Sequence, residues 1–397
     1  MNRTDHLPKL RRLTPAVRSC PASAALAAAR YNSERPGSWW TAFPHRKVAM
    51  NFQNRKTMSA GVRLGLLLVT ILACHVAAAA QPRKLIIDCD PGIDDAIAII
   101  LAMQYPGFEI LGITTTFGNA TLEQATKNAL RIVELSGKPI PVYKGASKPM
   151  IVPLDPPPDF VHGQDGLGNT RQPEPSTKPQ DKPAAQFLAD MAKAYPGQIT
   201  ILAVGRLTNL AEALKRDTSF AANIREVVLM GGALYVPGNV SPVAEANVSG
   251  DPHAADLVFT APWKVTMIGL DVTTKVRLND EILSRVKAGN ARYGPFIYSI
   301  SRFYADFHRK GRVTGGFYVH DPSAVVYLIE PGIFEVKEGP MRVVCEGIAI
   351  GQTIMAAYDY QFQLPPWKDK PLVKAAVAVD RERFQKTIES IMMGNQR

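Results

Sequence analysis

The sequence predicts an α/β protein: a single domain with a mostly parallel central sheet flanked by helices, as in a Rossmann-like core. Short apolar runs alternate with segments of helical periodicity from Lys84 to Cys345, a pattern typical of parallel sheets that helices cover. Hydrophobic residues make up 46% of the chain, which is ample for one large core. Acidic residues follow the first apolar run directly, and open α/β sheets bind ligands at the carboxyl ends of their strands.

The expected elements follow from these periodicities in chain order. We expect strands at Lys84–Asp88, Glu109–Thr115, Ile199–Val204, Glu226–Met230, Lys264–Leu270 and Arg342–Cys345. Helices are expected between the strands, among them Asp95–Gln104, Leu122–Ser136, Pro183–Ala194 and Leu207–Arg216. The segment Val152–Pro183 is rich in proline and polar residues, which predicts a long loop that borders a functional site.

The basic excess of the chain belongs to its N-terminal region. The formal net charge is +11, but residues 1–80 carry twelve Lys and Arg against two acids, which leaves 34 basic and 33 acidic residues from Gln81 onward. A nearly neutral body gives no reason to expect nucleic-acid binding.

Residues 1–80 are predicted to form a leader, and residues 81–397 the folded catalytic domain. The leader is interpreted as a disordered extension followed by a signal peptide over about 58–80, because Arg63 precedes the apolar run Leu64–Cys74 and an Ala-rich cleavage site near Ala80. We therefore expect a secreted protein with no stable membrane span after processing. The Arg- and Ala-rich residues 1–57 also suit a mitochondrial transit peptide, and a retained membrane anchor in the leader is a further alternative.

Four aspartates crowd the end of the first expected strand, in "KLIIDCDPGIDDAIAIILA". Asp94 and Asp95 fall in the first turn of the next expected helix, where capping or the helix dipole stabilises one or two acids. Asp88 and Asp90 need a further explanation, since clustered carboxylates raise one another's pKa unless a cation neutralises them. A hard cation with oxygen ligands, Ca²⁺ or Mg²⁺, is therefore expected.

Seven blocks in order along the chain resemble the inosine-uridine-preferring nucleoside hydrolase family. They are "DCDPGIDDA", "TTFGNATLEQATKNA", "HGQDGLG", "GRLTNLA", "LMGGALYVPGNVSPVAEANVSGDPHAA", "GLDVT" and "VHDPSAV". Together the blocks span nearly everything after the leader, so the resemblance implies a nucleoside hydrolase-like fold throughout. It also implies hydrolysis of the N-glycosidic bond of ribonucleosides to ribose and a base, by a homodimer or homotetramer.

The resemblance implies a Ca²⁺ site with four protein ligands: the side chains of Asp90, Asp95 and Asp321 and the backbone carbonyl of Thr208. All four are hard oxygen donors, as calcium prefers. The same resemblance makes Asp90 the general base for the attacking water and His320 the acid that protonates the leaving base. Direct attack by water implies inversion at the anomeric carbon.

Ribose recognition is implied in the same way. The positions that match sugar-binding residues of the family are Asp94, Asn119, Asn239, Glu245 and Asn247. Three of them lie in glycosylation sequons, and we expect none to carry a glycan, because it would block the site.

Other side chains are weighed individually. His162 either contacts the base or supports the long loop, and Tyr318 is a candidate for the base pocket. The aromatic residues of Ser301–Phe307 could stack on the base, but they are expected to pack their helix. His253 and His308 are expected at the surface.

The chain departs from the family pattern at two positions beside the expected site. Arg206 stands where the family usually has proline, and Ala246 where it usually has a bulky residue, so base preference is in doubt. Two other functions stay open. "LIIDCDPG" also resembles the Asp-x-Asp loop of haloacid-dehalogenase-type phosphatases, and a secreted nucleoside-binding protein without turnover would keep the same pocket.

Overall fold

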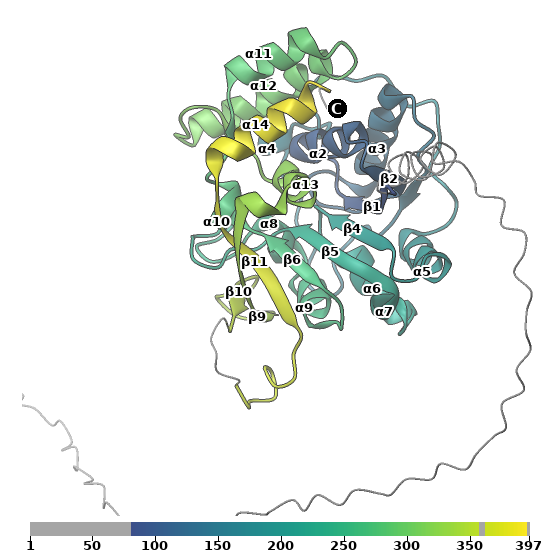
Figure 1. The fold of residues 1–397 in the computed structure, drawn as a ribbon, viewed down its shortest axis with the longest axis vertical. Helices are drawn as coiled ribbons and strands as arrows, with labels where there is room; N and C mark the ends of the chain where they lie inside the picture. Colours follow the sequence, from purple (N-terminus) through teal and green to yellow (C-terminus); the bar gives the residue numbers. More distant parts are fainter. Residues whose placement is uncertain (1–80, 357–361, 395–397) are drawn as a thin grey trace, which may run out of the picture. The chain divides into compact units, whose positions relative to one another are not determined.

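The computed structural model describes residues 81–356 and 362–394 (Figure 1). The leader predicted for residues 1–80, including the signal segment near 58–80, lies outside the described residues. Within the described ranges, no helix combines the length and the apolar character that crossing a membrane requires.

Among the described residues, nine strands form one sheet in the order β10-β9-β11-β6-β5-β4-β1-β2-β3. Their bounds are β1 Arg83–Cys89, β2 Phe108–Thr115, β3 Val142–Lys144, β4 Ile199–Ala203, β5 Ile224–Met230, β6 Val265–Ile268, β9 Phe334–Val343, β10 Thr353–Met355 and β11 Leu372–Val379. The strands from β11 to β3 are parallel, and β9 and β10 add antiparallel pairs at one edge. A separate antiparallel pair joins β7, Arg277–Leu278, to β8, Phe317–Tyr318.

Helices cover both faces of the sheet (Figure 1). One face carries α2 Ile93–Gln104, α3 Leu122–Ser136, α11 Asp280–Gly289, α12 Gly294–Lys310, α13 Asp321–Ile329 and α14 Arg381–Met392. The other carries α5 Ala184–Ala194, α6 Thr208–Arg216, α7 Phe220–Asn223 and α9 Pro252–Thr260. Short helical turns complete the chain: α4 Asp159–His162, α8 Ala246–Gly250, α10 Leu270–Thr273 and η1 Pro331–Ile333.

The strands have apolar side chains on both faces because each face packs against helices. In β1, Leu85 and Ile87 pack into one core, and Ile86 packs into the other. This two-sided burial accounts for the continuous apolar runs in the sequence. The predicted fold class, a single α/β domain with a mostly parallel sheet, is confirmed.

The predicted elements are found, with differences at their ends. Leu122–Ser136 is helical over the predicted range. The strand expected over Lys264–Leu270 ends at Ile268, because Gly269 is the N-cap of the short helix α10. The strand expected over Arg342–Cys345 is only the end of β9, which begins at Phe334 and stops at Val343. The segment Val152–Pro183 is largely a loop, but it contains α4.

The sheet order places a topological switch point between β1 and β4. From β1 the chain continues to β2 and β3 on one side, and from β4 it continues to β5 and β6 on the other. Loops that leave the carboxyl ends of two such strands diverge and form a crevice between them. The Asp90 loop follows β1, and the Arg206 loop follows β4.

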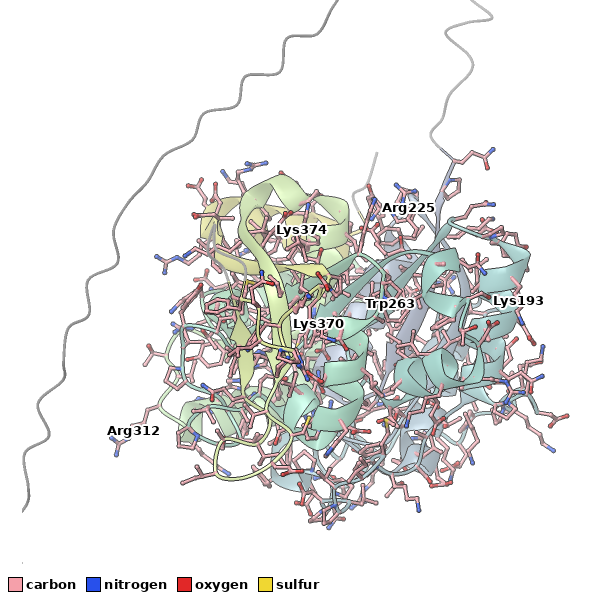
Figure 2. The ribbon with its side chains drawn as sticks, turned by 90° about the horizontal axis from the view of Figure 1, so that it is seen from below. Lys193, Arg225, Trp263, Arg312, Lys370 and Lys374 are labelled. Carbon is pink, nitrogen blue, oxygen red and sulfur yellow. The ribbon has the colours of Figure 1, made fainter. Side chains whose placement is uncertain are left out.

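Charged side chains are distributed around the outside of the domain. Lys193, Arg225 and Arg312 are exposed and lie well apart from one another in Figure 2. Trp263, in contrast, is buried and packs edge-on against Phe220. The spread of these basic side chains agrees with the nearly neutral charge of residues 81–397.

Candidate active site

A cavity of about 430 Å³ lies at the switch point. Its walls come from the start of α2, the loop after β2, α4, the segment that leads into α8, the C-terminal turns of α12, and the β8–α13 connection. Of the predicted site residues, the cavity is lined by Asp94, Asn119, His162, Asn239, Glu245, Asn247, His320 and Asp321. The fold therefore brings together residues from distant parts of the chain.

The start of α2 holds the aspartates in place. Asp95 accepts hydrogen bonds from the backbone N–H groups of Asp90, at 3.1 Å, and Gly92, at 3.0 Å. Asp94 and Asp95 lie in the first turn of the helix, as predicted. A Cβ atom at Gly92 would lie 2.7 Å from Nδ1 of His162, so only glycine permits this close approach.

Asp90, Asp94 and Asp321 each have one buried carboxylate oxygen without a hydrogen-bond partner among the described residues. These oxygens are Oδ1 of Asp90, Oδ1 of Asp94 and Oδ2 of Asp321. One ligand atom each from Asp94, Asp95 and Asp321 lies within 4.8 Å of the others. Unpartnered buried oxygens are costly, and a shared cation would satisfy them.

Burial raises the pKa of every carboxyl group in the cluster. The pKa of Asp94 rises to about 7 because of burial and then the charge of Asp95. Burial and the neighbouring acids hold the pKa of Asp90 and of Asp321 well above the usual range, and burial also raises the pKa of Asp95. These groups ionise together only if positive charge is added, so the donor set fits a hard divalent cation.

The two remaining predicted metal ligands contribute differently. Asp90 lies outside the compact trio, although its unpartnered Oδ1 is buried in the same cluster. Thr208 is buried at the start of α6, and its hydroxyl donates to Asp251 at 2.8 Å. The main-chain carbonyl of Thr208 therefore remains the atom that the prediction assigns to the metal.

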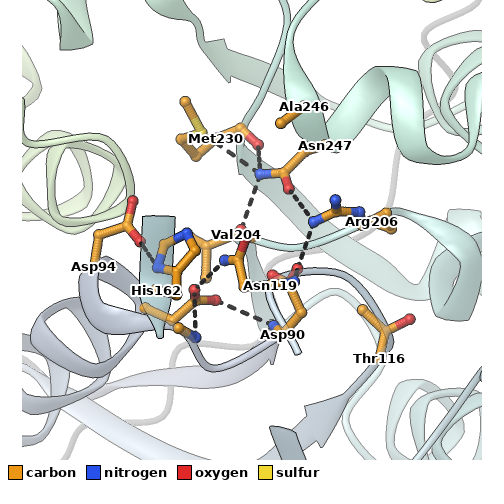
Figure 3. Close-up of polar contacts among 12 residues, drawn as sticks. Asp90, Asp94, Thr116, Asn119, His162, Val204, Arg206, Met230, Ala246 and Asn247 are labelled. Atoms are coloured by element: carbon orange, nitrogen blue, oxygen red, sulfur yellow. Dashed lines mark hydrogen bonds and ion pairs between the residues drawn. The ribbon is translucent and has the colours of Figure 1, made fainter. Parts of the chain in front are cut away.

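Backbone and amide hydrogen bonds fix the predicted sugar-binding residues. The side chain of Asn119 donates to Asp95 at 2.9 Å. Asn247 donates through Nδ2 to the carbonyl oxygens of Val204, at 3.0 Å, and Met230, at 3.1 Å, and so joins the ends of β4 and β5 (Figure 3).

Glu245 and Asn239, two further predicted sugar-binding residues, differ in burial. The carboxylate of Glu245 is buried and caps α8 by accepting from the backbone N–H groups of Asn247 and Val248; it also accepts from the N–H of Gly232. Asn239 is exposed at the rim of the cavity, and its Oδ1 accepts from the N–H of Ala246 at 3.0 Å.

Three histidines line the cavity. His162 accepts at Nδ1 from the N–H of Ile93, so its ring proton lies on Nε2, and burial lowers its pKa to about 3. His320 lies 2.8 Å from the hydroxyl of Thr273, and burial followed by the charge of His308 lowers its pKa to about 3. Both rings are therefore neutral at neutral pH.

His308 corrects a sequence-based expectation. It was expected at the surface but is only 4% exposed, and its Nδ1 donates to the carbonyl oxygen of Tyr304 at 2.9 Å. His253, also expected at the surface, is half-buried. His308 is buried because the spacing of Tyr304, Phe307 and His308 places them on one side of α12, where they line the cavity.

The aromatic residues of α12 were candidates for stacking on the base, but packing of the helix was the favoured interpretation; Tyr304 and Phe307 in fact line the cavity. Their three- and four-residue spacing was the signal that could have revealed this position. Tyr318 lines the cavity, as predicted. Arg206 is the other unforeseen member of the site: it was interpreted only through loop stiffness, yet its guanidinium reaches Asp90 at 2.6 Å.

Comparisons with known proteins agree with the fold. The family profile described as inosine-uridine preferring nucleoside hydrolase matches residues 85–386. Uridine nucleosidase 1 of Arabidopsis thaliana is 43% identical over 313 residues, 78% of this chain and 93% of that protein. The inosine-uridine preferring nucleoside hydrolase of Leishmania major is 38% identical over 308 residues, 77% of this chain and 95% of that protein.

Solved structures give the same result. A plant nucleoside hydrolase superposes with a TM-score of 0.77 at 38% identity, over 79% of this chain and 99% of the other. A purine-preferring ribonucleoside hydrolase from Gardnerella vaginalis superposes with a TM-score of 0.73 at 35% identity, over 79% of this chain and 98% of that protein. The sequence blocks, the sheet order and the acidic cluster at the switch point have the same explanation: the chain belongs to the inosine-uridine preferring nucleoside hydrolase family.

Proposed function

We propose that the protein hydrolyses the N-glycosidic bond of ribonucleosides with a bound Ca²⁺, releasing ribose and a base. The observation that carries the proposal is the cluster of Asp94, Asp95 and Asp321, whose ligand atoms lie within 4.8 Å of one another at the cavity. Amide and carboxylate side chains suited to a polyol line the same cavity. The membership of the chain in a nucleoside hydrolase family supports this reading.

The residues proposed to hold calcium are Asp90, Asp95 and Asp321, together with the carbonyl of Thr208, while Asp94 of the same cluster is proposed to bind the ribose. Calcium would supply Lewis-acid polarisation of a water molecule. Asp90 is suited to accept the proton of that water, because Oδ2 is engaged by the N–H of Asn119 at 2.7 Å while Oδ1 has no partner. Asp90 is therefore the proposed general base.

His320 is proposed to assist departure of the base. A histidine that donates a proton near neutral pH needs an ordinary pKa, but burial lowers the pKa of His320 to about 3. A neutral imidazole still carries one N–H, which can donate a hydrogen bond to the departing base. Full proton transfer requires the bound substrate to raise the pKa of His320 again.

Asp94, Asn119, Asn239, Glu245 and Asn247 are proposed to bind the ribose hydroxyls. The proposed role of Asp94 is supported by its Oδ1, which has no hydrogen-bond partner and is therefore free to accept from a hydroxyl. The loss of one hydroxyl would leave such buried groups unpaired, so the site should discriminate against deoxyribonucleosides.

The range of accepted bases is proposed to include uridine, since relatives named uridine nucleosidase are among the similar proteins. A purine-preferring relative is structurally similar as well, so inosine and adenosine belong in the test. We further propose secretion through the leader and assembly as a homodimer or homotetramer, supported by the leader sequence and the family resemblance. Sizing chromatography of the purified protein tests the assembly.

Product analysis with four substrates tests the proposal against its alternatives. The protein is incubated with uridine, inosine, adenosine and p-nitrophenyl phosphate, and reducing sugar and phosphate are measured. Ribose from at least one nucleoside is the expected result. Phosphate release would support the phosphatase alternative, and saturable nucleoside binding without any product would support a binding protein.

A further inference from the structure

Arg206 occupies the centre of the site. It lies in the loop between β4 and α6, and its side chain is 11% exposed. Nη1 donates to Oδ2 of Asp90 at 2.6 Å and to Oδ1 of Asn247 at 3.5 Å, so the guanidinium lies between these two side chains (Figure 3). Both partners belong to the proposed machinery, and Asp90 is 116 residues away in the chain.

Two glycines make room for the guanidinium. A Cβ atom at Gly118 would lie 2.2 Å from Nη1 of Arg206, and one at Gly250 would lie 2.5 Å from Nε. The Cβ atom at Gly118 would also lie 1.9 Å from Oδ2 of Asp90, so a larger residue at either position requires the arginine to move, and at Gly118 also Asp90. The backbone on both sides is therefore shaped around this side chain.

Arg206 supplies the positive charge nearest the acidic cluster. Among the described residues, it is the only Lys or Arg that forms an ion pair with Asp90, Asp94, Asp95 or Asp321. Its Nε is buried without a hydrogen-bond partner, which costs desolvation free energy without a compensating bond. Because burial of the Arg206 guanidinium is unfavourable for the fold, its presence is better explained by its effect on Asp90 than by a gain in stability.

The contact restricts Asp90 to one geometry. Its Oδ2 receives Nη1 of Arg206 and the N–H of Asn119, and its Oδ1 is left without a partner. A carboxylate held in this way cannot rotate to offer both oxygens to a cation. A positive charge at this distance also opposes the binding of a second cation in a poorly screened site.

We propose that Arg206 is a positioning residue, which holds the carboxylate of Asp90 with Oδ1 directed to the reaction and lowers the affinity of the site for Ca²⁺. The inference rests on the proposed function: its catalytic part depends on the proposed hydrolysis, and its metal part depends only on the proposed calcium site. Calcium would then be held more weakly than by the same acidic ligands without the arginine.

The test compares Arg206→Gln and Arg206→Lys with the parent protein and with a control, Arg342→Gln. Arg342 forms a comparable ion pair with Asp256, at 2.7 Å, outside the cavity. Calcium affinity is measured by isothermal titration, and kcat and KM for uridine are measured at saturating calcium. Circular dichroism establishes that each variant is folded.

Arg206→Gln should bind calcium about tenfold more tightly, because the opposing charge is removed. Its kcat should fall about tenfold with KM changed less than twofold, because Asp90 is no longer held. Arg206→Lys keeps the charge and should retain the parent calcium affinity while recovering part of kcat. Arg342→Gln should have the same calcium affinity, kcat and KM as the parent protein.

Unchanged or weaker calcium binding by folded Arg206→Gln would overturn the metal part, and an unchanged kcat would overturn the positioning part. If Arg206→Gln does not fold, Arg206→Lys decides: a kcat equal to that of the parent would overturn positioning. If the parent protein cleaves no nucleoside, the proposed function fails, but the calcium titrations still decide the role of Arg206.

Discussion

The substitution Asp94→Asn should stabilise the calcium-free protein at alkaline pH. Asp94 is buried, and burial with the charge of Asp95 raises its pKa to about 7. In the unfolded chain an aspartate titrates near 4. The stability contributed by the protonated group is complete below about pH 4 and is lost as the pH rises through about 7, because the group must then ionise inside the fold. Asparagine has a similar shape and no proton to lose.

The size of the effect follows from the two pKa values. One pH unit of difference between the folded and unfolded pKa corresponds to about 1.4 kcal/mol, so Asp94 should destabilise the fold by roughly 4 kcal/mol at pH 8 and by roughly 1.5 kcal/mol at pH 5. The stabilisation by Asp94→Asn should therefore grow by about 2 to 3 kcal/mol between pH 5 and pH 8. Calcium should reduce this difference, because it neutralises the cluster.

Urea unfolding in a calcium chelator, followed by tryptophan fluorescence at both pH values, measures this difference. Trp263 is buried and reports on the fold. The matched control is Asp155→Asn, since Asp155 is an exposed aspartate that lines the same cavity. It should change the free energy of unfolding little at either pH. If Asp94→Asn gave no gain at pH 8, or the same gain at both pH values, the reasoning would be refuted.

Four further predictions concern activity and processing. Asp90→Asn should lower kcat for uridine by about 10³-fold with the fold retained, because the proposed general base is lost; steady-state kinetics would contradict this by showing parent rates. Asp321→Asn should weaken calcium binding by at least about tenfold in isothermal titration, and an equal affinity would remove it from the ligand set. 2′-Deoxyuridine should be cleaved at least about 10²-fold less efficiently than uridine, and equal kcat/KM values would argue against a buried partner for the 2′-hydroxyl. If the protein is secreted as proposed, the mature form should begin near Gln81 and carry no glycan on Asn119. Mass spectrometry of the N-terminal and Asn119 peptides tests this, and an intact leader or glycan mass would contradict these expectations.

The helices, strands and strand-end aspartates that could be predicted depend on neighbouring residues or on a regular spacing of apolar residues. Leu122–Ser136 could be located to the residue because Thr121 caps the helix and Gly137 ends it in the left-handed conformation. The aspartates at the end of β1 could be placed at a sheet edge because the apolar run before them is a buried parallel strand.

The features that were missed depend on contacts between distant residues. The strand β11 is recognisable only through its pairing with β9 and β6, because its residues alternate incompletely between buried and exposed. His308 is an isolated histidine in the sequence, and its burial follows from where α12 packs. The contact of Arg206 with Asp90 depends on the angle between two loops and on the space left by Gly118. These three residues are far apart in the sequence, so no local pattern reveals the contact.

The proposed hydrolysis is tested most directly by proton NMR of uridine incubated with the calcium-loaded protein, recorded before the anomers of ribose interconvert. If a water with Asp90 as its base attacks opposite the departing base, the bond should break with inversion. This mechanism predicts that uracil and α-ribose appear together and that neither appears after calcium is chelated. Absence of ribose from uridine and inosine alike, or release of β-ribose first, would contradict it.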